Sequence, residues 1–112
     1  APTAQVLVVE RFLGIDAPQE TAAALAWLTR HVREDGGVAA YPGASHPSLT
    51  ETGYLYAALA AAGVAEEAPL RRRVLSWLTS HGGLRALDPL VQTYLVLAGV
   101  LHLWRFLQPV QV

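Results

Sequence analysis

The sequence predicts an all-α fold of about five helices, arranged as helical hairpin repeats. Helix-starting and helix-ending residues recur along the whole chain. Only residues 6–9 carry the β-branched pattern that is typical of a strand. A Trp-Leu-Thr string occurs at position 27 and again at position 77, which indicates a repeat. The length of 112 residues fits a single domain over residues 1–112.

A first helix is expected over residues 3–13. Val6, Val9 and Leu13 fit one face of a helix, although the run at 6–9 also suits a strand. A lone strand would have no partner for its backbone N–H and C=O groups. A helix is therefore the consistent interpretation of this segment.

A second helix is expected to begin after Asp16 and to end near residues 31–33. Asp16 can cap its N-terminus, and Pro18 stands in the first turn, where a missing N–H has no cost. The glycine and proline residues between positions 36 and 47 keep the following segment out of a helix. This segment is the one long loop that the sequence predicts.

Two further helices are expected on either side of Gly63. Ser48 and Glu51 have the spacing of a capping box, so the first of the two should run from residue 49 to about residue 62. The second should begin near Pro69, after two acidic residues that suit the positive end of a helix.

A last helix is expected to begin at Asp88 and Pro89 and to continue to about Leu107. It contains the most apolar stretch, residues 90–104, which falls short of the roughly 20 residues that span a bilayer. A helix that is apolar on nearly every face is typically buried on both sides. Either it is the central helix of the domain or a partner covers its outer face. The candidate interface residues are Leu95, Leu101 and Trp104.

Two Gly-Gly turns are expected to end helices, because glycine readily adopts the left-handed conformation found there. Asp35 is expected to accept backbone N–H groups of the first turn rather than to act as an acid. His31 and His81 occupy equivalent positions, where helix capping is favoured over metal binding. The residues assigned to the turns are Asp35, Gly36, Gly37, Gly82 and Gly83.

The Trp-Leu-Thr string belongs to an internal repeat with copies at about 21–63 and 70–107. In both copies a His, a Gly-Gly pair, a loop and an apolar helix that opens with Thr and Tyr follow the string. Chance similarity is the weaker explanation, because Trp occurs only three times in the chain. Two copies and one N-terminal helix leave an unfinished edge, since stacked neighbours stabilise such units.

The first copy combines three features. A helix ends in Trp-Leu, an Asp-Gly-Gly turn precedes an aromatic residue, and an Ala-Leu-rich helix begins with Thr. In these features it resembles one repeat of the prenyltransferase and squalene cyclase family, and the second copy resembles a degenerate repeat without the Asp. The resemblance implies an α/α toroid with an apolar, often aromatic-lined centre that holds isoprenoid chains. The matching segments are 24–28, 34–38, 41–43, 48–52 and 57–63.

Five aromatic residues are candidates for lining an apolar ligand pocket. Aromatic side chains at helical spacing are also typical of an ordinary core, so both interpretations stay open. The candidates are Trp27, Tyr41, Tyr54, Trp77 and Tyr94.

The sequence departs from the resembled family at the residues that carry catalysis. The Asp-x-Asp-Asp protonation motif of the cyclases has no counterpart, and the protein prenyltransferases' zinc site needs a Cys, which this chain lacks. The chain also lacks the His spacings of common metal sites and the Gly-x-Ser-x-Gly turn of a nucleophile. We therefore expect no catalytic residue, no metal and no cofactor.

Charge and composition restrict the class of partner. The net charge is −1 and the eight basic residues form no basic stripe, which argues against nucleic acid. Apolar residues make up 53% and charged residues only 15%, against roughly 25% in a typical domain. This excess favours a homo-oligomer or a larger protein assembly. No signal peptide is recognisable, which favours the cytoplasm.

These observations favour a non-catalytic helical repeat module that docks on itself or on another subunit and binds an apolar, isoprenoid-like ligand. One alternative is a fragment of a terpenoid cyclase or prenyltransferase-like enzyme whose catalytic acids lie elsewhere. Another is a subunit that packs on a membrane complex through residues 90–104, without spanning the membrane.

Overall fold

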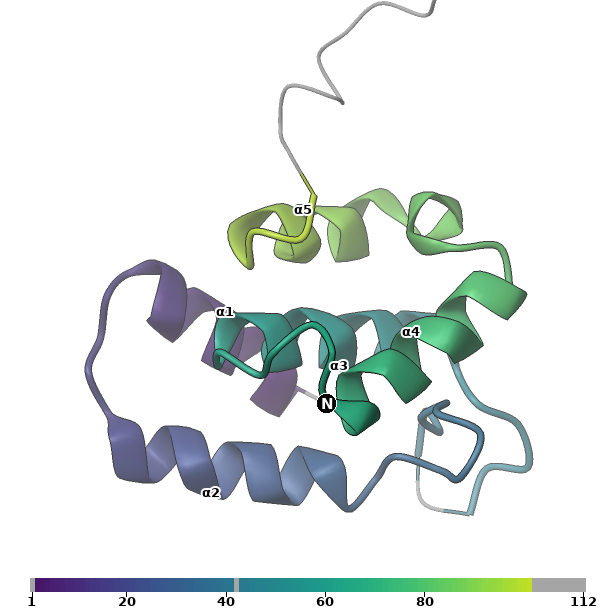
Figure 1. The fold of residues 1–112 in the computed structure, drawn as a ribbon, viewed down its shortest axis with the longest axis horizontal. Helices are drawn as coiled ribbons and strands as arrows, with labels where there is room; N and C mark the ends of the chain where they lie inside the picture. The colour runs from purple at the N-terminus through teal and green to yellow at the C-terminus, as the bar shows by residue number, and fades with distance from the viewer. Residues whose placement is uncertain (1, 42, 102–112) are drawn as a thin grey trace, which may run out of the picture.

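The computed structural model describes residues 2–41 and 43–101. These residues form five α-helices and one short 3₁₀ turn, with no strand beyond two isolated bridges (Figure 1). The predicted all-α fold with five helices is therefore confirmed. The elements are α1 (Pro2–Phe12), α2 (Pro18–Thr29), α3 (Leu49–Ala61), α4 (Pro69–Ser80), η1 (Leu84–Ala86) and α5 (Pro89–Leu97).

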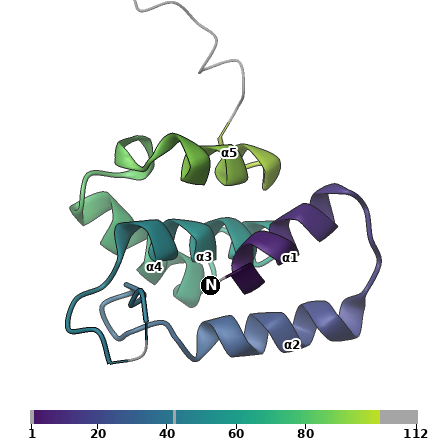
Figure 2. The same cartoon turned by 180° about the vertical axis from the view of Figure 1, so that it is seen from behind.

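Helix α3 is the centre of the structure. It contacts all four other α-helices, and every residue from 52 to 59 is buried. Figures 1 and 2 show α1, α3 and α4 in a middle layer, with α5 on one side of it and α2 on the other. Small residues such as Gly53, Ala57 and Ala58 let the neighbouring helices approach closely. The central helix of this domain is thus α3 rather than the last helix.

The last helix is shorter than predicted. Helix α5 ends at Leu97 instead of near Leu107, because Gly99 adopts a left-handed conformation with φ of +79° and ends the helix. Val91 and Leu95 are buried, whereas Leu90 is exposed, so the helix is buried on one side only. Among the residues described here, no helix is long and apolar enough to cross a membrane.

Of the two helix caps predicted from the sequence, the structure has the one at Ser48 but not the one at Asp16. The Ser48 hydroxyl accepts a hydrogen bond from the Glu51 backbone N–H at 3.2 Å, which is one half of the predicted capping box. The Ser48 backbone N–H donates to the Val38 carbonyl oxygen at 2.6 Å. Asp16 was expected to cap α2 but does not, because the capping position is occupied by Ala17, one residue later. Helix α2 also ends at Thr29, slightly before the predicted residues 31–33.

The two hairpins pack together through glycines. A Cβ at Gly37 would lie only 2.8 Å from Cε2 of Trp77 in α4, and a Cβ at Gly36 would overlap the backbone carbonyl of Arg73. On the other side of α3, a Cβ at Gly53 would lie 2.6 Å from Cγ1 of Val91 in α5. The absence of side chains at these positions is therefore what allows the helices to meet.

Candidate functional site

The two Trp-Leu-Thr strings place the same side-chain arrangement at the ends of α2 and α4. The His31 Nδ1 atom lies 2.7 Å from the Trp27 carbonyl oxygen, and His81 Nδ1 lies 2.7 Å from that of Trp77. The ring centroids of each pair are 4.1 and 4.0 Å apart. A carbonyl oxygen only accepts, so Nδ1 carries the proton and donates. In the neutral imidazole, Nε2 is then a free acceptor.

The first Gly-Gly turn has the local hydrogen bond expected of Asp35. Its Oδ1 atom accepts from the Gly37 backbone N–H at 2.9 Å. Gly36 has a φ of +95°, which a residue with a side chain rarely adopts. At the second turn, Gly82 and Gly83 also have positive φ values, of +111° and +81°.

A buried hydroxyl fixes the segment that leaves this turn. Thr52 Oγ1 accepts from the Val38 backbone N–H at 2.9 Å and donates to the Ser48 carbonyl oxygen at 2.6 Å. Thr52 is the buried polar residue of the core, and both of its hydrogen-bonding capacities are used. The hydroxyl therefore holds Val38 against the first turn of α3.

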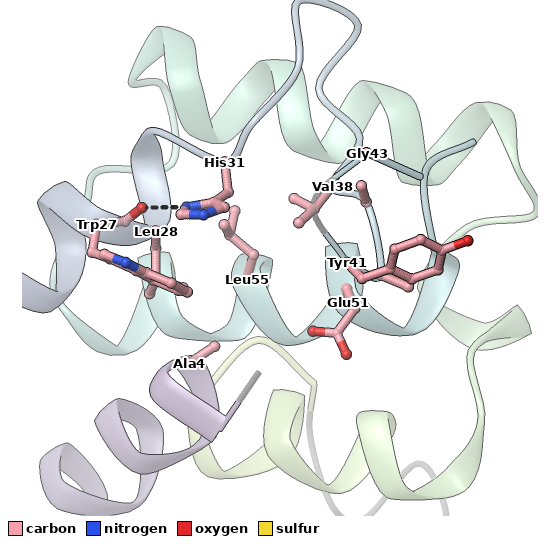
Figure 3. Close-up of a pocket in the computed structure, with 11 residues that line it drawn as sticks. Ala4, Trp27, Leu28, His31, Val38, Tyr41, Gly43, Glu51 and Leu55 are labelled. Carbon is pink, nitrogen blue, oxygen red and sulfur yellow. Dashed lines mark hydrogen bonds between the residues drawn. The ribbon is translucent and has the colours of Figure 1, made fainter. Parts of the chain in front are cut away.

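Residues 38–41 and Gly43 close a pocket between α2 and α3 (Figure 3). Its volume is about 190 Å³, and its lining is mostly apolar. An apolar cavity of roughly 150 Å³ is known to hold one benzene molecule, so this pocket has room for one ring or one short branched chain. Buried residues form the floor: Ala4, Leu28, Val38 and Leu55.

Aromatic and polar side chains form the rim of this pocket. Figure 3 shows Trp27 of α2 and His31, which follows α2, on one side, and Tyr41 and Glu51 on the other. Trp27, in the last turn of α2, is 37% exposed. Glu51 is half-buried and is the one Asp or Glu among the lining residues. The pocket is thus an apolar cavity with its polar groups at the mouth.

Two of the five predicted ligand-binding residues, Trp27 and Tyr41, line this pocket. The other three lie elsewhere. Trp77 is buried beneath Gly37, and Tyr54 packs edge-to-face on Tyr94, with ring centroids 5.3 Å apart. Burial raises the pKa of the Tyr54 hydroxyl above its ordinary value, and the nearby Tyr94 adds to this shift.

Sequence reasoning missed His31 and Glu51 as rim residues, because both were given purely local capping roles. A signal for each was present. His31 follows Trp27 by four residues, just beyond the end of α2, and its ring packs on the indole. Glu51 lies one turn before the buried Leu55 and shares a face of α3 with it. The two residues line the same cavity only because the fold packs α2 beside α3, which the sequence pattern does not show.

The three candidate interface residues also lie in different surroundings. Leu95 is fully buried in the core of this chain and offers no surface to a partner. Leu101 is half-buried against the same core. Trp104 lies outside the described residues. Leu95 therefore belongs to the fold itself, and the interface expected there has to be sought on another surface.

Comparison with known proteins adds the family. A family model for the squalene-hopene cyclase N-terminal domain matches residues 1–110. Searches of curated proteins and of solved structures found no match. Across residues 2–41 and 43–101, no three His, Cys, Asp or Glu side chains gather as a metal site would require. The family match covers nearly the whole chain and agrees with its helical hairpins. The chain therefore belongs to the squalene-hopene cyclase N-terminal domain family, whose fold is of the α/α toroid type.

Proposed function

We propose that this chain is a non-catalytic part of a squalene-hopene cyclase-like protein, and that its pocket binds an apolar, isoprenoid-like group. The pocket between α2 and α3 is the observation that carries the proposal. Its floor is entirely aliphatic, and an aromatic side chain stands on each side of its mouth. Burial of apolar ligand surface would provide the driving force for binding.

The size of the pocket limits what it holds. About 190 Å³ accommodates a ring or a short branched chain, so a long isoprenoid would place only one end here. We assign no catalytic residue, because the sequence contains no Asp-x-Asp-Asp motif. The chemistry of a cyclase would then depend on residues outside this chain.

A titration of the 112-residue chain with geraniol tests the binding proposal. Tryptophan fluorescence should change as geraniol enters the pocket, because Trp27 lines it. The repeat supplies a matched control. Trp27→Phe should remove the change, whereas Trp77→Phe should keep it, since Trp77 is 6% exposed and lies outside the pocket. Loss of the change in both variants, or in neither, would contradict the proposed site.

A second part of the proposal concerns docking. Large apolar side chains are exposed along α1 and just after it, and they include Phe12 at 61% and Leu13 at 64%. An apolar surface of this kind is typical of an interface. We propose that it docks on another helical hairpin of the same fold, and on a second copy when the chain is alone. The exposed residues are Val6, Val9, Phe12, Leu13 and Ile15.

Native mass spectrometry tests the docking proposal. The wild-type chain should form a dimer or a larger oligomer, and Phe12→Glu combined with Leu13→Glu should shift it to the monomer. Arg72→Glu on the exposed face of α4 should leave the oligomer unchanged. A wild-type chain that is monomeric at 12.0 kDa would overturn self-docking.

A further inference from the structure

The mouth of the α2–α3 pocket carries a hydrogen-bond acceptor that an apolar ligand does not need. We propose that this acceptor, Nε2 of His31, gives the pocket a preference for a short apolar alcohol over the corresponding ether. The hydroxyl of the ligand donates to Nε2, while its chain fills the aliphatic floor. The inference rests on the proposed function, because it assumes that an apolar group occupies that floor.

The imidazole of His31 is held in one orientation by Trp27. Its Nδ1 atom donates to the Trp27 carbonyl oxygen at 2.7 Å, and its ring lies on the indole with centroids 4.1 Å apart (Figure 3). With the proton on Nδ1, the other nitrogen of the neutral ring is an acceptor. Because the bond to the carbonyl fixes both the tautomer and the ring, the acceptor is in place before a ligand arrives.

A ligand at the mouth changes the surroundings of Nε2. His31 is exposed and lines the pocket, so Nε2 is open to water. A ligand that covers this nitrogen displaces the water, and an acceptor that loses water without gaining a donor costs free energy. A hydroxyl supplies a new donor, whereas an ether oxygen only accepts. The alcohol therefore avoids a cost that the ether has to meet.

The other polar side chains of the lining are less suited to accept the proton of the ligand. The indole N–H of Trp27 only donates. Tyr41 is 65% exposed, and Figure 3 shows its hydroxyl pointing away from His31. Glu51 already takes part in an interaction of its own. His31 is thus the side chain that we expect the hydroxyl of the ligand to meet.

Geraniol and geranyl methyl ether carry the same geranyl chain and differ in the hydroxyl proton, so this pair tests the acceptor. Their affinities for the 112-residue chain are measured by calorimetry at about pH 8, where imidazole is ordinarily neutral. We expect geraniol to bind about fivefold more tightly than the ether. The additional methyl group of the ether adds apolar surface, so hydrophobic burial alone would give the opposite order.

His31→Phe is the decisive variant, and the repeat supplies its control. Phe keeps a ring that can pack on Trp27 but has no nitrogen. His81→Phe loses the same Nδ1 bond to a carbonyl oxygen and the same kind of ring contact, at a position outside the pocket. The preference for geraniol should disappear in His31→Phe and remain in His81→Phe.

Nitrogen NMR of the wild-type chain gives a second measurement that needs no variant. With geraniol, the Nε2 signal of His31 should keep the position of a hydrogen-bonded nitrogen. With the ether it should move toward the position of a nitrogen without a hydrogen bond. The Nε2 signal of His81 should move with neither ligand. The same response of His31 to both ligands would contradict the proposed hydrogen bond.

The outcomes separate this inference from the proposed function. If geraniol and the ether bind the wild-type chain equally, the pocket is apolar only and the preference for an alcohol is overturned. If neither ligand binds, the apolar site itself is wrong. If His31→Phe keeps the preference for geraniol, the hydroxyl is recognised elsewhere and the assignment to His31 fails.

Discussion

The ends of α2 and α4 share one local structure but differ in their surroundings. In each, a His caps the helix and packs on the Trp one turn earlier, with nearly the same ring distances. Trp77 is 6% exposed, because the Gly36–Gly37 turn of the first hairpin covers it, whereas Trp27 is 37% exposed at the mouth of a cavity. The spacing of residues determines the local arrangement, and the neighbouring hairpin decides whether it becomes core or pocket.

The Thr residues of the two copies show the same contrast. Thr52 and Thr93 both donate to the carbonyl oxygen four residues earlier, at 2.6 and 2.9 Å. Only Thr52 also accepts a backbone N–H, that of Val38, and only Thr52 is buried. The first copy therefore ties a long loop to its helix, while the second copy uses the same residue at the surface.

Truncation of the two Trp side chains should give the largest difference between the copies. Trp77→Ala should lower the free energy of unfolding by about 4 kcal/mol, because it leaves a cavity in the core. Trp27→Ala should cost about 1 to 2 kcal/mol, since the indole is already partly in water. Urea denaturation of both variants measures the difference. Equal losses would mean that the two copies are equally buried.

The glycine turns provide the next comparison. Gly36→Val should cost about 3 kcal/mol, because a side chain there meets the Arg73 backbone and φ is positive. Gly83→Val has the same backbone strain with open space around it, and should cost about 1 to 2 kcal/mol. Asp35→Ala should cost about 1 kcal/mol through one lost hydrogen bond. Thermal or urea unfolding that ranks Asp35→Ala above Gly36→Val would contradict the packing described here.

The Thr pair is the third comparison, and its buried copy should lose less stability than the Trp77 or Gly36 variants. Thr52→Val should cost about 2 kcal/mol, because the buried Val38 N–H loses its acceptor. Thr93→Val removes one hydrogen bond at the surface, and should cost about 0.5 kcal/mol or less. Hydrogen exchange at the Val38 amide gives a second measurement, since this amide should exchange faster only in Thr52→Val. A similar cost for both variants would show that burial of Thr52 adds nothing.

Much of the fold could be predicted from the sequence, because its signals are local. Ser48, Pro18, Pro69 and Pro89 mark helix starts that the structure has within one residue. The end of α5 was missed, since one glycine at position 99 was outweighed by the long apolar run around it. The buried centre was also misplaced, because α3 and α5 are both apolar and only the packing distinguishes them.

The candidate site was less predictable, because its walls come from four separate segments. Trp27 and Tyr41 were identified by residue type alone, and the same criterion selected Trp77, which is core. Glu51 and His31 have local partners that fully explain their positions in the sequence. Their common direction depends on how α2 packs beside α3, which no single segment contains.

Helix α3 has one further consequence. It belongs to the first copy, yet it carries the surface on which α4 and α5 of the second copy pack. Neither hairpin therefore encloses a hydrophobic core of its own, and we expect the two copies to unfold as one cooperative unit rather than as two modules in tandem. If this protein arose by duplication, the ancestral hairpin would have needed a second copy of itself to fold. Cutting the chain between the copies would leave two pieces with half a core each.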